Sequence, residues 1–286
     1  MKHKSFAVFI LTHGRAANVK TVKSLRKAGY TGKVLLVIDN EDEQEEHYKR
    51  IYGKQNVVVF DKLDIAERYD TMDTFEERRT IFYARNACFE IAEKLGYEYF
   101  LELDDDYTQF AYKTVKGVKF SSIRIRNANE VFDCMLDFLD VSGAYTVAFA
   151  QGGDFIGGKD NNRYKDKILR KAMNTFFCKT SRKFEFIGRV NEDVNTYCLM
   201  GTQGKLLFTY TDIAIEQETT QKQKGGMSEQ YLDSGTYLKS FYTVICCPSC
   251  VTIGMMGGSK KGMRLHHMVN WNNCCPKIIS EKYKKE

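Results

Sequence analysis

YEYFLELDDDY, residues 97 to 107, decides the fold, because an apolar run leads directly into three consecutive carboxylates. Five of the seven residues before Asp104 are aromatic or aliphatic, which is typical of a buried strand. Adjacent carboxylates repel one another and raise their own pKa values unless a cation or strong donors compensate them. Side chains two residues apart on an extended backbone point the same way. We therefore expect Asp104 and Asp106 to face one ligand, while Asp105 points elsewhere.

Oxygen-only ligation of this kind suits Mg²⁺ or Mn²⁺, ions that commonly reach an enzyme already bound to a diphosphate. The alternative is an acidic turn at the end of a strand, because Asp is a frequent and well-solvated turn residue. The stretch alone leaves both interpretations open.

The composition favours one continuous unit over residues 1–286, since the chain has only two prolines. Lys and Arg exceed Asp and Glu by 43 to 37. The excess is concentrated: residues 111–126 hold five basic and no acidic residues, and residues 257–286 hold seven basic and two acidic ones. This distribution predicts a face that binds a polyanion, the alternative being an ordinary surface with scattered lysines.

The first apolar run, 6–11, is shorter than the core of a signal peptide, and no run reaches membrane-spanning length. We expect a cytoplasmic protein that does not contact a membrane and keeps its nine cysteines reduced. Cys247-Pro-Ser-Cys250 has the spacing of half a zinc site. The adjacent pair Cys274-Cys275 lacks the usual two-residue gap, which favours cysteines that only pack.

An alternation of strands and helices precedes the acidic stretch. Apolar patterns predict strands over 5–15, 33–43 and 56–62, a helix over 18–28 capped by Asn18, a polar connection over 64–74 and a helix over 76–96. This order is that of an α/β nucleotide-binding unit, in which ligands gather at the carboxyl ends of the strands. Thr12, Arg15 and Asp39 lie at such ends.

The helix over 76–96 is predicted to bury a stripe formed by Ile81, Cys88, Ile91 and Leu95. Arg78 and Arg85 are two turns apart, so they are expected on one face of it. A planar arginine fork near Asp104 would suit a pyrophosphate. Solvated arginines on a helix surface are the alternative.

The second half of the chain predicts a basic hairpin over 110–126 around Lys116-Gly117, which could follow a phosphate backbone. A helix over 191–205 is predicted to be capped by Asn191, with Glu192 and Asp193 in its first turn. Favourable interaction with the helix dipole is by itself a sufficient reason for acidic residues there. Residues 224–237 have the composition of a loop that closes over a substrate.

Motifs in sequence order carry a resemblance that covers essentially the whole chain. They are THGR, FEERRTIFYARNACFEIA, LDDDYT, FAQGGDFIGG, GRVNEDVNTY, GGMSEQYLDSGTYLKSFYTV and RLHHMVNWNNCCPKIISEKYKK. Together they resemble GT-A glycosyltransferases, and more closely the bacteriophage TET-associated glycosyltransferases.

The resemblance implies a Rossmann-like mixed α/β sheet flanked by helices, with a basic hairpin and a basic C-terminal segment. Residues 1–107 would bind the nucleotide-sugar and residues 108–286 the acceptor. The implied activity is metal-dependent transfer of a sugar from a UDP-sugar to the hydroxyl of 5-hydroxymethylcytosine in phage DNA, in the host cytoplasm. The implied metal is Mn²⁺ or Mg²⁺.

The resemblance also implies residue roles. For the donor, Asp39 would bind the nucleoside, Arg85 the diphosphate and Asp104 the ribose or sugar, with Thr12 and Arg15 in the same site. For the metal, the ligands would be Asp104, Asp106 and His266, with His267 as the alternative to His266. For the acceptor, Asp193 would be the general base, and Glu192 would orient it or bind the acceptor. Because Asp193 would lie beside a helix N-terminus, we expect it to stay ionised and to be a weaker base.

Two other functions compete with this one. A GT-A enzyme could act on a glycan or protein acceptor, although the basic hairpin and tail argue against it. A non-catalytic DNA-binding module could keep the fold. The joint presence of the carboxylates, Arg85 and the two histidines disfavours that module.

Overall fold

The computed structural model describes residues 1–73, 78, 80–117, 119–161, 164, 167–217, 238–258 and 262–277. The strands are β1 (Phe6–Leu11), β2 (Lys33–Asp39), β3 (Val57–Phe60), β4 (Tyr99–Asp104), β5 (Tyr107–Lys116), β6 (Lys119–Arg124), β7 (Thr146–Ala150), β8 (Ile168–Leu169), β9 (Thr175–Lys179), β10 (Leu207–Gln217), β11 (Val251–Gly258) and β12 (Gly262–Val269). The helices are α1 (Lys20–Lys27), α2 (Glu45–Tyr52), α3 (Lys62–Arg68), α4 (Phe82–Lys94), α5 (Ala128–Ser142) and α7 (Glu192–Thr202). Short 3-10 turns are η1 (Ala16–Asn18), η2 (Lys54–Asn56) and η3 (Gly152–Phe155), and residues 238–246 are helical.

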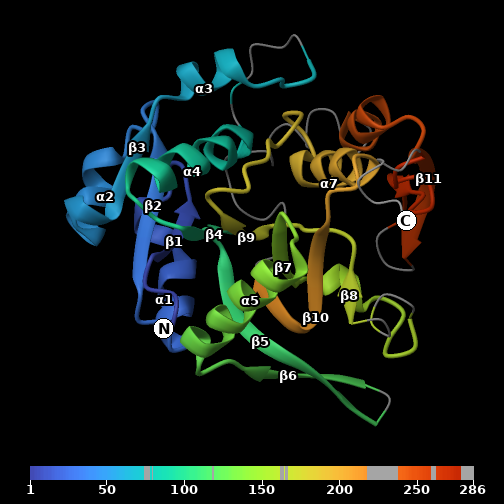
Figure 1. The fold of residues 1–286 in the computed structure, drawn as a ribbon, viewed down its shortest axis with the longest axis horizontal. Helices are drawn as coiled ribbons and strands as arrows, with labels where there is room; N and C mark the ends of the chain where they lie inside the picture. Colours follow the sequence, from blue (N-terminus) through green and yellow to red (C-terminus); the bar gives the residue numbers. More distant parts are fainter. Residues whose placement is uncertain are drawn as a thin grey trace, which may run out of the picture.

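One mixed sheet forms the centre of the molecule, in the order β3-β2-β1-β4-β9-β7-β10-β5-β6, with β8 paired to β10 (Figure 1). Strands β2, β1 and β4 are parallel, and Leu11 at the end of β1 lies level with both Val37 and Asp104. Their carboxyl ends therefore meet at one edge. The predicted mixed α/β sheet flanked by helices is confirmed.

Both faces of this sheet are covered, which explains why its first strand is apolar throughout. Phe6, Val8 and Ile10 pack on one face with residues of α1 and α5. Ala7, Phe9 and Leu11 pack on the other with residues of α3, α4 and α7. A strand buried on both sides reads as a continuous apolar run rather than an alternation.

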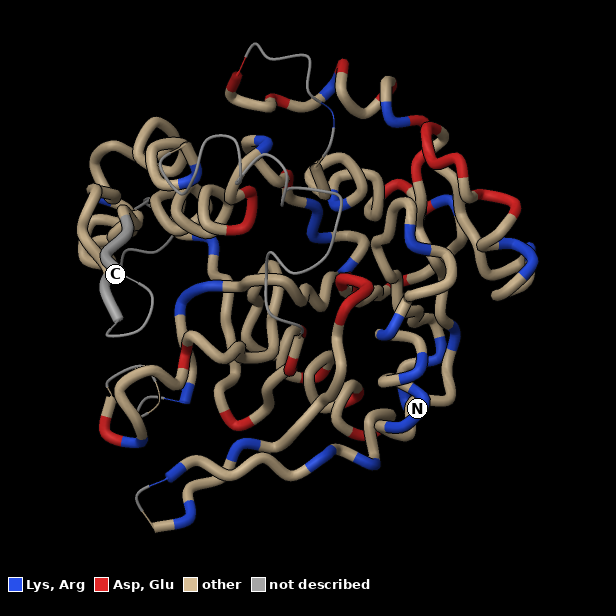
Figure 2. Tube along the Cα trace, turned by 180° about the vertical axis from the view of Figure 1, so that it is seen from behind, with Lys and Arg blue, Asp and Glu red and all other residues tan. Residues whose placement is uncertain are grey.

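The predicted basic hairpin is formed by β5 and β6, paired antiparallel from Ala111–Arg124 to Lys116–Lys119. It projects from the body of the protein (Figure 1), and Figure 2 shows Lys and Arg spaced along it. Two aromatic contacts hold the hairpin near its turn: the Phe120 ring lies 5.1 Å from that of Phe155 and 4.7 Å from that of Tyr164.

Several local predictions are wrong. Asn18 ends η1 and makes no cap, because α1 starts at Lys20 after Val19. Part of the connection predicted over 64–74 is helix α3, which Asp61 caps by accepting from the backbone of Leu63 and Asp64. At the end of α4, Leu95 is 49% exposed and lies at the C-cap, outside the buried stripe.

Arg78 does not share a helical face with Arg85, because α4 begins only at Phe82. Arg78 instead contacts Glu41 at 2.8 Å on the surface. The loop predicted over 224–237 lies outside the described residues. Across the helices that the structure describes, none combines the length and the apolarity that a bilayer crossing requires.

Candidate active site at the carboxyl ends of the strands

The acidic triplet forms the turn between β4 and β5. Asp105 is 5% exposed and points to the end of β1, where it accepts hydrogen bonds from Thr12 Oγ1 at 2.7 Å and Arg15 Nη1 at 3.0 Å. Asp104 and Asp106 are both partly exposed. Asp105 thus points away toward its own partners, as the sequence predicted, and it links Thr12 and Arg15 to the triplet.

Arg85 on α4 lies beneath the triplet and joins it to α7. Its Nη2 donates to Asp104 Oδ1 at 3.0 Å, and its Nε donates to Glu192 Oε1 at 3.0 Å. Its Nη1 lies 3.5 Å from Glu102 Oε2. The guanidinium also lies over the ring of Phe176, 4.8 Å from its centroid. We name Arg85 with Glu102, Asp104 and Glu192 the Arg85 cluster.

The sequence suggested an arginine whose guanidinium is free to bind a pyrophosphate, but the guanidinium of Arg85 is already paired. Arg85 is 1% exposed, and three carboxylates from two elements, β4 and α7, occupy its donor edges. This geometry favours a positioning role, in which Arg85 fixes Asp104 and Glu192 relative to each other. Its contact with a diphosphate stays a prediction.

The Arg85 cluster contains more carboxylates than cations, and this excess shows in the pKa values. Burial, opposed by Arg85 and reinforced by Asp106 and Glu192, raises the pKa of Asp104 to about 7. Burial raises the pKa of Glu102 to about 8, again against the attraction of Arg85. Glu102 Oε1 is buried without a hydrogen-bond partner. Additional positive charge at this site would therefore be favourable.

The donor atoms at the triplet fit a hard divalent cation. Mg²⁺ is typically held by one or two carboxylates, the remaining positions going to water and substrate phosphates, and Asp104 and Asp106 provide that number. Across the part of the chain that is described, no three His, Cys, Asp or Glu side chains are arranged to hold an ion as they stand. The triplet thus fits a site completed by phosphate oxygens better than an all-protein cage.

The first turn of α7 carries the expected acids, but its cap differs from the prediction. Asn191 has a left-handed backbone with φ 55°, and its side chain makes no cap hydrogen bond. Its Nδ2 donates to Lys239 O at 2.7 Å and lies 3.0 Å from Thr243 Oγ1. The side chain therefore ties the start of α7 to the helical residues 238–246 instead of closing the helix end.

Asp193 is 8% exposed, and its Oδ1 accepts the backbone N–H of Val194 at 2.7 Å. Burial, reinforced by Glu192 and opposed by Lys239 and Arg85, raises its pKa to about 6. Burial thus works against the weakening of this base that we expected from its place at the start of a helix. A carboxylate with this pKa is ionised near neutral pH and still accepts a proton readily.

His266 and His267 lie on β12 with their ring centroids 4.2 Å apart. His267 Nδ1 is 3.4 Å from Asn191 Nδ2. Burial lowers the pKa of His267 to about 3, helped by repulsion from His266 and Lys239, so its imidazole is neutral. The structure thus brings His267 to the start of α7, and neutral imidazole is the form that binds metals. Metal ligation by His266 or His267 stays a prediction.

A second charged group lies at the ends of β1 and β2. Asp39 accepts from His13 Nδ1 at 2.8 Å and lies 3.4 Å from Lys62 Nζ. The hydrogen bond that His13 donates to Asp39 raises the pKa of His13. Burial of Asp39 opposes its ionisation, but His13 and Lys62 outweigh burial and lower its pKa. We name His13, Asp39, Asp42 and Lys62 the His13 cluster; His13 also lies 3.8 Å from Asp42.

Sequence reasoning missed several of these residues. Glu102 alone gave a signal, since a charged residue inside an otherwise apolar strand needs a buried partner. The sequence showed no such sign for Lys62, Lys239 or Thr243, whose importance comes from contacts between distant segments.

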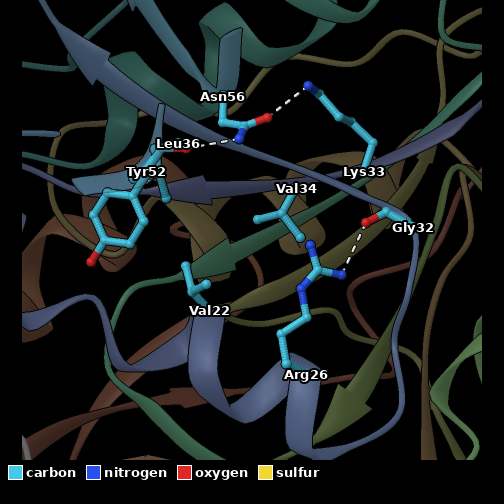
Figure 3. A pocket seen from close by; sticks show the side chains of 8 residues that line it. All are labelled: Val22, Arg26, Gly32, Lys33, Val34, Leu36, Tyr52 and Asn56. Carbon is cyan, nitrogen blue, oxygen red and sulfur yellow. Dashed lines mark hydrogen bonds between the residues drawn. The ribbon is translucent and has the colours of Figure 1, made fainter. Parts of the chain in front are cut away.

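A small pocket lies far from this edge, at the start of β2. It is lined by Val22, Arg26, Gly32, Lys33, Val34, Leu36, Tyr52 and Asn56. Figure 3 shows two of its polar side chains occupied with each other, Lys33 Nζ donating to Asn56 Oδ1 at 2.7 Å. Asp39 is six residues further along the strand, roughly 20 Å away at ~3.3 Å per residue. The pocket therefore does not belong to the candidate active site.

Comparison with known proteins gives one family and several distant structures. Residues 6–226 match the family described as TET-Associated Glycosyltransferase. No curated protein matches the chain. Glucosyl-3-phosphoglycerate synthase from Mycobacterium tuberculosis, solved with Mn²⁺, UDP and phosphoglyceric acid, is 8% identical, with 92% of this chain and 86% of that chain covered and a TM-score of 0.47.

A mannosyltransferase from Pyrobaculum calidifontis, solved with GDP-Man and Mn²⁺, is 13% identical, with 76% of this chain and 58% of that chain covered and a TM-score of 0.47. These structural likenesses are too weak to carry an argument about function. The family match, by contrast, covers most of the chain. The chain therefore belongs to the TET-associated glycosyltransferase family and is a glycosyltransferase.

Proposed function

We propose that the chain transfers a sugar from a nucleotide-sugar, bound with Mn²⁺ or Mg²⁺ at Asp104 and Asp106, to the hydroxyl of 5-hydroxymethylcytosine in DNA. One observation carries the proposal. The single guanidinium of Arg85 contacts both Asp104, at the triplet, and Glu192, beside the proposed base Asp193. The group that would hold the leaving diphosphate and the group that would activate the acceptor therefore lie side by side.

The nucleoside would occupy the ends of β1 and β2. Asp39 is our proposed ligand for it, in the donor site with Thr12 and Arg15. The bond between His13 and Asp39 keeps the Asp39 carboxylate ionised and oriented, ready to accept hydrogen bonds from a ribose or a pyrimidine. Residues 1–107 would supply this donor half.

In the reaction, Asp193 would accept the proton of the hydroxymethyl group as its oxygen attacks the anomeric carbon and the bond to the diphosphate breaks. Glu192, held by Arg85, would orient the acceptor. The divalent cation, when bound, neutralises the charge that develops on the departing diphosphate, with His266 or His267 as its protein ligand beyond the triplet. Burial of Asp193 serves this step because it keeps the proton acceptor sufficiently basic.

The β5–β6 hairpin supports DNA as the acceptor. Lys116, Lys119, Arg124 and Arg126 are exposed along it, with no acidic residue between positions 111 and 126. Regularly spaced cations on a projecting ribbon bind a phosphate backbone irrespective of base sequence. Residues 108–286 would supply the acceptor half, and the reaction would take place in the cytoplasm of an infected host.

One assay tests the proposal. The protein, Mn²⁺ and a panel of UDP-sugars are incubated with hydroxymethylated or ordinary DNA, and the digested nucleosides are weighed. Addition of one sugar to the hydroxymethylated base alone supports the proposal. Nucleotide release without a DNA product would indicate a different acceptor, and tight DNA retention without turnover would indicate a binding module.

A further inference from the structure

Within the described residues, the β11–β12 sheet is not attached to the rest of the protein by strand pairing, so other contacts must hold it in place. Strands β11 and β12 form a two-stranded sheet of their own, and the described strands show no pairing between it and the large sheet. A two-stranded sheet is marginally stable by itself. Yet this one carries His267, whose Nδ1 lies 3.4 Å from Asn191 Nδ2 at the start of α7. Figure 1 shows β11 beside α7.

Four cysteines lie where the two parts meet. Cys198 is on α7 and is fully buried, and Cys274, which follows β12, is 1% exposed. Cys247 and Cys250 lie between the helical residues 238–246 and β11 and are 4% and 2% exposed. All four belong to one packed cluster, although they come from three separate segments.

The thiols contact one another across these segments. The thiol of Cys198 interacts with those of Cys247 and Cys274, and the thiol of Cys274 interacts with that of Cys250. The backbone fits this convergence closely: a Cβ placed on Gly201 of α7 would lie 2.9 Å from Cys274 O. No disulfide joins them, and all four are free thiols.

Local structure also holds the four cysteines in place. The turn from Cys247 to Cys250 is closed by a hydrogen bond from Cys250 N to Cys247 O at 3.0 Å. Arg170 Nη2 donates to Cys274 O at 3.0 Å, which brings a positive charge to the cluster. Tyr197 and Trp271 stack beside it with ring centroids 5.4 Å apart. These surroundings would fix the ligands of an ion and compensate the charge of several thiolates.

We propose that Cys198, Cys247, Cys250 and Cys274 bind one structural Zn²⁺ that fastens the β11–β12 sheet to α7. Four thiolates around one ion is a common closed zinc site, and a two-residue gap such as that between Cys247 and Cys250 is usual for a pair of ligands. The sequence alone showed only half of the pattern, because Cys198 lies about fifty residues before Cys247 and Cys250, and Cys274 lies further on.

The thiols require a small rearrangement to enclose an ion. In the structure as described, they meet in pairs and no three of them surround a common point at binding distance. On binding, rotation about their Cα–Cβ bonds would turn the sulfurs inward, and zinc would replace the thiol protons, which pass to solvent.

The zinc site is independent of the proposed sugar transfer, so its test measures metal and not activity. The chain of residues 1–286 is purified under reducing conditions without chelator, and its bound metal is measured by mass spectrometry. We expect about one zinc per chain, retained during dialysis against Mg²⁺. Replacement by Co²⁺ is expected to give the sulfur-to-metal charge-transfer bands of tetrahedral thiolate coordination.

The chain offers matched control variants. Cys198→Ser and Cys250→Ser are expected to lose the zinc and the cobalt bands. Cys246→Ser and Cys275→Ser, each adjacent in sequence to a proposed ligand, are expected to keep both. Retention of full zinc by Cys198→Ser would overturn the proposed ligand set.

If a serine variant does not fold, alkylation of the cysteines in the wild-type chain provides a second test. With metal bound, the four proposed ligands should resist alkylation, and after chelation they should react. The proposal is overturned if the reduced wild-type chain contains no zinc and gives no cobalt–thiolate bands, if alkylation is unchanged by chelation, or if intact mass shows that two hydrogens have been lost to a disulfide.

Discussion

The two charged clusters at the strand ends are balanced in opposite ways. In the His13 cluster, carboxylates meet cations, and the pKa of Asp39 is lowered while that of His13 is raised. In the Arg85 cluster, carboxylates exceed cations, and the pKa of Asp104 rises to about 7. The first cluster is electrostatically complete, whereas the second needs a further cation. A donor with its metal would supply that cation, so the imbalance distinguishes the proposed metal site from the proposed nucleoside site, where the charges are already paired.

The largest effect on the rate of sugar transfer is expected from Asp193, the proposed general base next to Glu192 of the Arg85 cluster. Asp193→Asn keeps the side-chain shape but removes proton acceptance, so transfer should slow by about 10²–10⁴-fold. Donor binding, measured by calorimetry with UDP and Mn²⁺, should not change. Asp106→Ala is the complementary variant and should lose metal-dependent donor binding. Near-normal transfer by Asp193→Asn would refute the base assignment.

Removal of the one cation of the Arg85 cluster should destabilise the fold. Arg85→Met leaves Asp104, Glu102 and Glu192 without their partner in a buried place, a change that typically costs about 3–5 kcal/mol. Denaturant unfolding followed by circular dichroism measures this loss.

Arg78→Met is the matched control for that experiment. Arg78 is paired with Glu41 on the surface, where such pairs contribute about 0–1 kcal/mol. Equal stability of the two variants would show that the Arg85 cluster contributes nothing specific.

The imbalance also predicts how pH affects stability. A carboxyl group whose pKa is raised in the folded state binds more protons folded than unfolded. Asp104 therefore lowers the stability of the metal-free protein as pH rises from about 4 to about 7. Because Mn²⁺ competes with that proton, the increase in melting temperature on adding Mn²⁺ should be larger at about pH 8 than at about pH 5.5. Asp104→Asn should remove this difference, and an equal shift at both pH values would contradict the prediction.

The smallest effect is expected in the His13 cluster. The raised pKa of His13 contributes stability that is fully present below its unfolded value near 6.5 and is lost as pH rises through the folded value. His13→Gln should therefore cost stability, about 1 kcal/mol at most for a half-exposed pair, in acidic but not alkaline solution. Thermal melts across this range measure it, with His47→Gln as the control. A loss that does not depend on pH would indicate a packing effect instead.

The sequence allowed the fold to be predicted where one segment alone determines its structure. Strands β1 and β4 and the basic hairpin were read correctly from their apolar and alternating patterns. Strand β9 was not predicted, because its five residues become a central strand only through antiparallel pairing with β4 and β7. Helix α2 was missed as well, since it is largely polar and has Tyr48 as its one buried residue.

The sequence indicated which residues to consider for the candidate site, but not which of them contact each other. The triplet, Glu192 and Asp193 followed from motifs and helix position. The role of Arg85 did not, because its partners come from β4 and α7, and a pattern within α4 contains no information about them. Likewise the partners of Asn191 lie about fifty residues further along the chain.

Because Asp104 and Glu192 share the guanidinium of Arg85, a change at one carboxylate affects the contact of the other. Asp104 and Glu192 compete for the same positive charge, so anything that draws Asp104 toward a newly arrived cation leaves Arg85 more strongly attracted to Glu192. We therefore expect a cation at the triplet to strengthen the contact between Arg85 and Glu192 at the start of α7. In the proposed reaction, an arginine placed in this way would couple donor binding to the orientation of Glu192.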